Sequence, residues 1–402
     1  MRELVHVLQP HDLSKQFIAD QRALEKKWPF AYEKLYRLHQ LYLSVKDKQP
    51  EIGQEIIAQH ILQTAGNLLT PATAYAAITS AIKAAKAFLA SMVHEFIPEL
   101  FRLPFTSDGV STPTDDPLEL LKIIWNPPGC SNFASLRSFE ANLFWHLGMK
   151  YLLMRLQQKP LESQLRDLTL WLENDLFVTA PDAQNQQTII TCDYDPQNAN
   201  RFSTFRTGHQ LLFPIFYRLI EVEDARGRKK QVLVIYESRI KKEPDLFRKI
   251  LLYSKDEIPL AGDSCAITLV CFSEEECQLV MEKLRRSFFN NGGAITNLKI
   301  KGNGGKENSF SSSLSEPETK FRAFVHGGLV ECQIFLFPNF FNRHLSLGEE
   351  NHHLYRLSQV LPLFALFFPP ALYGISWSDD AVKQRLRDLQ IHRIMANYPA
   401  AA

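Results

Sequence analysis

The spacing of apolar residues divides the chain into a helical part and a part that mixes strands with helices. Up to about residue 175, apolar side chains recur every three or four positions, as in QFIADQRALEKKWPFAYEKLYRLHQLYLSV and SLRSFEANLFWHLGMKYLLMRLQQ. This spacing places apolar side chains along one side of an α-helix. Thr70-Pro71 and Asp116-Pro117 are typical of helix starts. We therefore expect residues 1–175 to form an all-helical domain.

From about residue 185 the pattern becomes that of strands separated by helices. Short apolar or β-branched runs include QTIITCDY, VLVIYES, CAITLVCF and AITNLKI, and FRAFVHGGLVECQIFLF predicts a hairpin that turns at its two glycines. Ser273 and Glu276 have the spacing of a helix capping box. The predicted fold class is α+β: a mixed α/β domain with a central mixed sheet at residues 185–360, and a C-terminal helical extension at residues 361–402.

Composition excludes several classes of protein. The 402 residues are 45% hydrophobic and 22% charged, so the chain can bury real cores and is not intrinsically disordered. A net charge of +1 argues against coating DNA through charge alone, although a local basic site remains open. Two apolar stretches, residues 73–97 and 361–377, are interrupted by lysines or prolines, and we expect buried core rather than membrane spans.

Cysteine usage indicates a reducing compartment. The six cysteines include no CxxC pair, and Cys265 and Cys271 fall within an apolar strand-like run, where free cysteine behaves as a small hydrophobe. The N-terminal residues MRELVHVLQPHDLSK lack the apolar core of a secretion signal. We therefore expect a cytoplasmic protein.

Candidate chemistry begins at SRIKKEPDLFRKI, where an apolar strand runs into basic residues. Arg239 and Lys241 are two positions apart and so share one face of a strand, and Lys249 lies in the helix that follows. A helix N-terminus adds backbone donors and positive dipole character. The arrangement suits a polyphosphate, and the alternative is an ordinary solvated strand end.

Two acidic residues on other predicted strands extend this candidate site. Asp263 stands immediately before CAITLVCF, and Glu331 lies within LVECQIFLF. Glu331 and Gln333 alternate with apolar residues, so both face one side of their strand. Two carboxylates that meet beside a group of cations could hold a divalent metal against phosphates. Taken separately, each is also explained as a strand-end or edge charge.

In this order the segments resemble the synthetase domain of the RelA/SpoT family, the bacterial enzymes that make alarmone nucleotides. The family pattern closes a strand with Arg-x-Lys and carries a further Lys on the next helix, which resembles the three basic residues above. A metal-binding Asp that opens the next strand is similar to Asp263. A later Glu-x-Gln-Ile strand is similar to Glu331 and Gln333.

Two weaker motifs complete the resemblance, which extends over residues 239–356. The family loop Lys-x-Asn-Gly-Tyr-x-Ser resembles Lys306, Asn308 and Phe310, and a terminal Ala-His-x-x-Tyr-Lys resembles residues 353–356. The resemblance implies a nucleotidyltransferase-like fold that transfers pyrophosphate from ATP to a ribose 3′-hydroxyl, usually that of GDP or GTP.

The resemblance also assigns roles. Asp263 and Glu331 would be catalytic and would hold Mg²⁺, with Glu331 orienting or deprotonating the attacking hydroxyl. Phe310 would stack on the acceptor base. The residues expected to bind nucleotide or phosphate are Arg239, Lys241, Lys249, Lys306, Asn308, Phe310 and Gln333.

Two departures from the family pattern leave alternatives open. Thr268 and Phe335 stand where the family carries arginines, and each lost charged hydrogen bond is worth about 1.5–3 kcal/mol. The alternatives are a catalytically degenerate nucleotide-binding module that reports to the helical part, or a toxin or effector that uses the same chemistry on another acceptor such as RNA. Residues 1–175 are then a candidate docking region for a protein partner.

Overall fold

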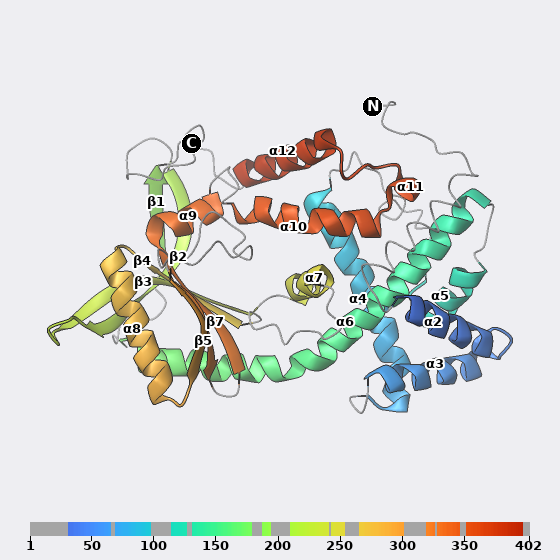
Figure 1. The fold of residues 1–402 in the computed structure, drawn as a ribbon, viewed down its shortest axis with the longest axis horizontal. Helices are drawn as coiled ribbons and strands as arrows, with labels where there is room; N and C mark the ends of the chain where they lie inside the picture. The colour runs from blue at the N-terminus through green and yellow to red at the C-terminus, as the bar shows by residue number, and fades with distance from the viewer. Residues whose placement is uncertain are drawn as a thin grey trace. The chain divides into compact units, whose positions relative to one another are not determined.

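The computed structural model describes residues 31–65, 69–97, 114–126, 131–178, 187–193, 210–240, 243–253, 265–300, 319–325, 328–345 and 351–396 (Figure 1). The chain forms two compact units, each assembled from distant segments. The first unit takes residues 1–158, 247–258 and 359–389, and the second takes 159–246, 259–358 and 390–402.

The first unit is helical in all its described parts. Two predicted helix starts are confirmed: α4 follows Thr70, and α5 is capped by Asp116, whose carboxylate accepts a hydrogen bond from the Glu119 amide at 3.0 Å. The Tyr75 hydroxyl donates to the same carboxylate at 3.0 Å and ties α5 to α4. The helices that lie wholly or partly in this unit are α2 (Ala31–Val45), α3 (Pro50–Ala65), α4 (Pro71–Phe96), α5 (Pro117–Trp125), α6 (Ser131–Trp171), α7 (Glu243–Tyr253), α10 (His352–Phe367), α11 (Pro370–Tyr373) and α12 (Asp380–Ala396).

The two apolar stretches, residues 73–97 and 361–377, that were expected to be buried core rather than membrane spans both contribute to the core of this unit. Helix α4 is the one described helix whose length and composition would allow it to cross a membrane, and 44% of its most apolar window is buried inside the protein. It packs closely on α6, where Gly148 leaves room for Ile82. In the second stretch Phe364 and Phe367 are fully buried, and the helix ends before the two prolines, as predicted.

Among its described residues, the second unit is built on a sheet of seven strands in the order β1-β2-β3-β4-β7-β6-β5. Neighbouring strands are antiparallel except for β4 and β7, which run parallel. The predicted α+β class with a mixed sheet is confirmed, although the β2–β3 hairpin is longer than its apolar runs predicted. The strands are β1 (Gln187–Asp193), β2 (Gln210–Glu223), β3 (Lys229–Ile240), β4 (Cys265–Cys271), β5 (Ala294–Ile300), β6 (Thr319–Val325) and β7 (Gly328–Leu336).

Helix α8 (Glu274–Asn290) covers one face of this sheet and closes its core (Figure 1). The predicted cap is present: the Ser273 hydroxyl accepts from the Glu276 amide at 3.2 Å. Apolar side chains from β4, β6 and β7 alternate toward α8 and meet Leu284 and Phe288, both fully buried. The alternate residues of the same strands therefore lie on the opposite face.

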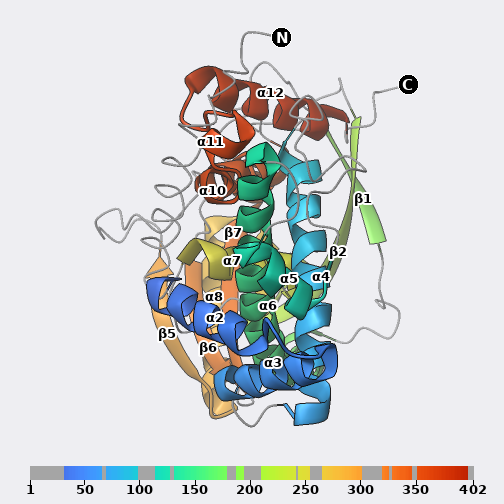
Figure 2. The ribbon, with the colours of Figure 1, turned by 90° about the vertical axis from the view of Figure 1, so that its right-hand side faces the viewer.

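A glycine turn carries the chain from α8 into β5. Gly292 has a φ of +70°, which glycine adopts without strain. A Cβ on Gly293 would lie 2.8 Å from the Phe324 carbonyl oxygen and 2.9 Å from that of Phe288, so only glycine fits this close approach. The turn places β5 beside β6 at one edge of the sheet (Figure 2).

Candidate polar site on the sheet

The face of the sheet opposite α8, here called the polar face, gathers charged and amide side chains in adjacent rows. Glu331 of β7 lies opposite Ala266 of β4 and opposite Arg322 of β6. Gln333 lies in the next row on the same face, because Val330, Cys332 and Ile334 point into the core beneath α8. The prediction that Glu331 and Gln333 share one side of their strand is confirmed. The positions of this face on the central strands are Glu237, Arg239, Ala266, Thr268, Lys320, Arg322, Glu331 and Gln333.

A chain of polar contacts fixes the Glu331 carboxylate. Only 5% of Glu331 is exposed. One carboxylate oxygen lies 3.0 Å from Lys320 Nζ, and the other accepts a hydrogen bond from Gln333 Nε2 at 2.5 Å. Arg343 of α9 (Phe337–Leu345) donates to Gln333 Oε1 at 3.0 Å. A buried carboxylate needs such donors, since burial without them would be costly.

Arg343 also lies over Phe335, with its guanidinium carbon 5.3 Å from the ring centroid. Phe335 is fully buried next to this network, and Thr268 is buried beside Gln333. These are the two positions at which the family pattern has arginines. The Arg343 guanidinium of α9 therefore lies beside Phe335, the phenylalanine at a position where the family pattern has an arginine.

Arg322 differs from the other cations of the polar face. It is the residue directly across from Glu331, yet Glu331 pairs with Lys320 instead. Within the described part of the chain, the Arg322 guanidinium makes no hydrogen bond or ion pair. The face thus holds a half-buried positive group beside a carboxylate that is already engaged, which is an arrangement suited to an anionic ligand.

Strand β4, which begins two residues after Asp263, is the neighbour of β7, which carries Glu331. Asp263 lies two residues before β4, outside the described residues, whereas β4 pairs in parallel with β7. The β3 residue Arg239 lies opposite Ala266, so its backbone position belongs to the row of Glu331. Lys249 is in α7, in the part that belongs to the first unit, and remains a predicted phosphate ligand. The other predicted residues outside the described parts are Lys241, Lys306, Asn308 and Phe310.

No metal centre is formed by the described residues: among them, no three His, Cys, Asp or Glu side chains lie close enough to hold an ion. Both oxygens of Glu331 already accept from Lys320 and Gln333. A Mg²⁺ site of the predicted kind therefore depends on Asp263 and on displacement of Lys320.

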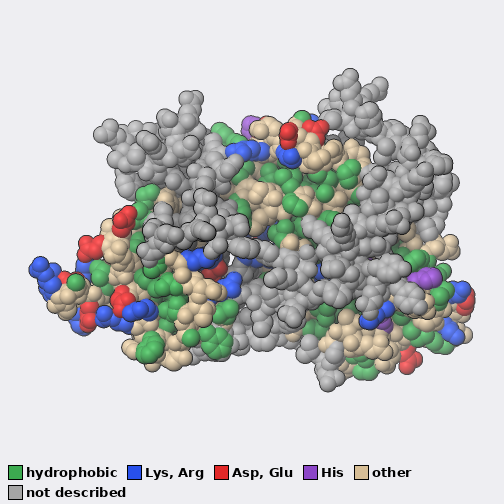
Figure 3. Space-filling model, viewed as in Figure 1, with side chains coloured by type: hydrophobic (Ala, Val, Ile, Leu, Met, Phe, Trp, Pro, Cys, Tyr) green, Lys and Arg blue, Asp and Glu red, His purple; other side chains and the backbone are tan. Residues whose placement is uncertain are grey.

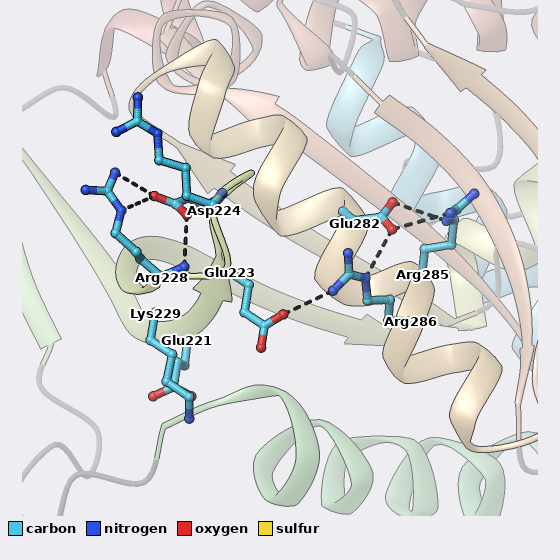
Figure 4. A network of polar contacts seen from close by, with 9 residues as sticks. Glu221, Glu223, Asp224, Arg228, Lys229, Glu282, Arg285 and Arg286 are labelled. Atoms are coloured by element: carbon cyan, nitrogen blue, oxygen red, sulfur yellow. Dashed lines mark hydrogen bonds and ion pairs between the residues drawn. The ribbon is translucent and has the colours of Figure 1, made fainter.

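The basic hairpin between β2 and β3 is a structural network. Figure 3 shows Lys and Arg side chains gathered with acidic ones at the hairpin end of the second unit, at the left of the view. Asp224 accepts from the amides of Arg226 and Arg228 and pairs with the Arg228 guanidinium at 2.8 Å (Figure 4). Lys229 pairs with Glu221 across the strands at 2.7 Å. These contacts hold the pKa of the Asp224 and Glu221 carboxyls below their usual range.

Thiol chemistry is disfavoured at the cysteines that line the core beneath this site. Burial, reinforced by the charge of Glu331, raises the pKa of the Cys332 thiol far above its usual range. A hydrogen bond with Cys277 and then burial raise the pKa of Cys271 as well. Both thiols therefore stay protonated at neutral pH and act as small apolar side chains.

Sequence reasoning missed three residues of the polar face: Lys320, Arg322 and Arg343. The alternation in KFRAF, residues 320–324, carried a signal for the first two, because it places every second residue on one side of a strand. Arg343 gave no local signal, since its contact depends on how α9 folds back after β7. Comparisons with protein-family models, with characterised proteins and with solved structures found no match to this chain.

Proposed function

We propose that the chain is an ATP-dependent pyrophosphate transferase whose site is the polar face around Glu331. The donor is ATP, and the acceptor is the ribose 3′-hydroxyl of a guanine nucleotide or a related acceptor. The observation that carries the proposal is one row of the sheet. In this row Glu331 of β7 lies between Arg322 of β6 and Ala266 of β4, the backbone position of Arg239 on β3 lies beyond Ala266, and Lys320 contacts one carboxylate oxygen of Glu331.

The reaction class comes from the family resemblance, and the row supplies its physical parts. Attack of O3′ on the β-phosphorus of ATP forms the new O–P bond and breaks the bond to the α-phosphate oxygen, releasing AMP. Glu331 accepts the hydroxyl proton, and Lys320 moves from Glu331 to a phosphate oxygen as the ligand arrives. Arg322 and Arg239 offset the charge of the transferred group.

Gln333 and Arg343 are positioning residues in this scheme. Gln333 donates to Glu331 and accepts from Arg343, so the carboxylate keeps its orientation when Lys320 leaves. The Mg²⁺ that accompanies ATP would neutralise phosphate charge, and Asp263 is its predicted ligand. The described residues alone do not form a site for this ion.

A transfer assay tests the proposal. Purified chain is incubated with γ-labelled ATP, Mg²⁺ and candidate acceptors: GDP, GTP and short RNAs with a free 3′-hydroxyl. Label should appear on an acceptor, and Glu331→Gln should slow transfer by about 100-fold or more, as expected for loss of a general base. The matched control is Glu282→Gln, which changes a partly exposed acid on α8. Transfer that is equal in wild type and Glu331→Gln would overturn the assignment.

A second function, nucleotide binding without turnover, is favoured by one specific observation. Both oxygens of Glu331 are engaged by Lys320 and Gln333, which is the state of a structural carboxylate. In that case nucleotides should raise the melting temperature of the chain, by more for tighter-binding nucleotides at equal concentration, while no label is transferred. The same samples used for the transfer assay decide between the two functions.

A further inference from the structure

Strand β6 presents a cation, a second cation and an aromatic ring in succession on the polar face. Lys320, Arg322 and Phe324 occupy alternate positions, whereas Phe321 and Ala323 are fully buried in the core beneath α8. Phe324, the next-to-last residue of β6, is 51% exposed, so its ring is accessible on the same face as the two cations. Its neighbours across the strands are Ala294 and Leu329, so no bulky charged group stands directly beside the ring.

A β-bulge brings another cation to this face. Thr296 lies opposite Arg322 and Lys299 lies opposite Lys320, so β5 has one extra residue between the two pairs. Asn297 takes up the extra length with a φ of 54°, a left-handed conformation that asparagine tolerates better than most residues. With a regular register, Leu298 would stand opposite Lys320. The bulge turns Lys299 to the polar face, as bulges near functional sites often re-aim side chains.

The resulting charge pattern calls for an anion. Like charges directly across two strands repel, and Lys299 and Lys320 are such a pair. Together with Arg322 they make three cations on β5 and β6 against the one acid, Glu331, that faces them from β7. A phosphate group bound by Lys299 and Arg322 would offset this excess of positive charge through charge-assisted hydrogen bonds.

We propose that this surface, Lys299, Lys320, Arg322 and Phe324, binds the acceptor nucleotide, with its phosphates held by Arg322 and Lys299 and its base stacked on Phe324 rather than on Phe310, to which the family resemblance assigns that role. The assignment as acceptor rests on the proposed function. Phe324 is the diagonal neighbour of Glu331 across β6 and β7, about 7–8 Å away, a gap that a ribose can bridge. A nucleotide whose base stacks on Phe324 can therefore place the 3′-hydroxyl of its ribose near the Glu331 carboxylate.

Equilibrium binding without ATP tests the surface apart from any reaction. Titrations use GDP, a short single-stranded oligoribonucleotide, and inorganic pyrophosphate as a ligand that has charge but no base. Phe324→Ala should weaken binding of the base-bearing ligands by about 5- to 100-fold, the range of stacking losses on alanine substitution, and leave pyrophosphate unchanged. Phe324→Tyr, which keeps the ring, should bind like wild type. Arg322→Gln should weaken all ligands.

Two control variants lie on α8, on the other side of the sheet. Phe289→Ala removes a ring that is 79% exposed, and Arg285→Gln removes an exposed arginine. Neither should change affinity. If Phe324→Ala binds every nucleotide as tightly as Phe289→Ala does, the proposal that this surface binds the acceptor is refuted. A tighter, more salt-dependent affinity for the oligoribonucleotide than for GDP identifies an RNA end as the acceptor, and the reverse order identifies a mononucleotide.

The outcome is separable from that of the proposed function. If Phe324→Ala selectively loses nucleotide binding but wild type transfers no label, the binding surface is supported and the proposed transfer reaction is refuted. If Phe324→Ala transfers label with an unchanged KM for the acceptor, the proposed binding surface is refuted and the proposed reaction is supported.

Discussion

The pair formed by Lys320 and Glu331 can be tested by a double-mutant cycle. The charges are 3.0 Å apart, and at an effective dielectric constant of about 20 their attraction is on the order of 5 kcal/mol before desolvation. Glu331 is buried, whereas the Lys320 side chain is 42% exposed, so solvent screening removes much of this energy. We expect a net coupling of about 1–3 kcal/mol between Lys320→Met and Glu331→Gln.

The two single variants should lower the free energy of unfolding by different amounts. Lys320→Met leaves a buried carboxylate without its cation and should cost about 2–4 kcal/mol, somewhat less than a fully buried pair would. Glu331→Gln should cost less, because the half-exposed Lys320 can turn toward water. Urea denaturation of wild type, both single variants and the double variant gives the coupling.

The control cycle uses Arg286 and Glu223, a pair at 3.3 Å whose side chains are 58% and 55% exposed (Figure 4). An exposed pair of this kind should couple by about 0–1 kcal/mol. Additivity of Lys320→Met and Glu331→Gln within about 0.5 kcal/mol would refute the view that Lys320 holds the carboxylate.

Three further predictions concern the framework. Phe288→Ala should lower the free energy of unfolding by about 3–5 kcal/mol because its ring is fully buried, whereas Phe289→Ala, next to it but 79% exposed, should change it by less than about 0.5 kcal/mol in the same urea titration; equal effects would contradict the assignment of the core face of α8. Gly148→Ala should destabilise the first unit by about 1–3 kcal/mol, measured by thermal unfolding, because its Cβ would clash with Cγ1 of Ile82 on α4 and lie 3.1 Å from Cα of the same residue, and a neutral result would contradict that packing. Burial and then the Asp116 carboxylate raise the pKa of Tyr75, so Asp116→Ala should bring that pKa down toward the ordinary value in an ultraviolet titration, and an unchanged pKa would show that the cap does not face the phenol.

The elements of the fold were predictable because each has a local cause. A continuous apolar run marked β4, and alternating apolar residues marked the β6–β7 hairpin. Ser273 and Asp116 marked helix starts through the hydrogen bonds that their side chains accept. The same alternation placed Glu331 and Gln333 on one face. A side-chain period of two is a property of any strand, so the sequence alone was sufficient for this part of the site.

The rest of the site depends on contacts between residues that are distant in the chain. The local sequence does not indicate that Lys320 rather than Arg322 pairs with Glu331, because the pairing depends on the β6–β7 register and on the length of the side chains. The bulge at Asn297 changes which of Leu298 and Lys299 lies on the polar face, and an alternation pattern cannot locate an inserted residue. The sequence also predicted domains as continuous ranges, whereas the first unit includes residues 247–258 and 359–389.

The most direct test of the account is a solved structure of the chain with a non-hydrolysable ATP analogue and Mg²⁺. We expect the analogue's phosphates to lie on the polar face in contact with Arg322, with Lys320 Nζ moved from Glu331 to a phosphate oxygen. Asp263 and Glu331 should both contact the same ion. Phosphates bound elsewhere, with the contact between Lys320 and Glu331 unchanged, would contradict this expectation.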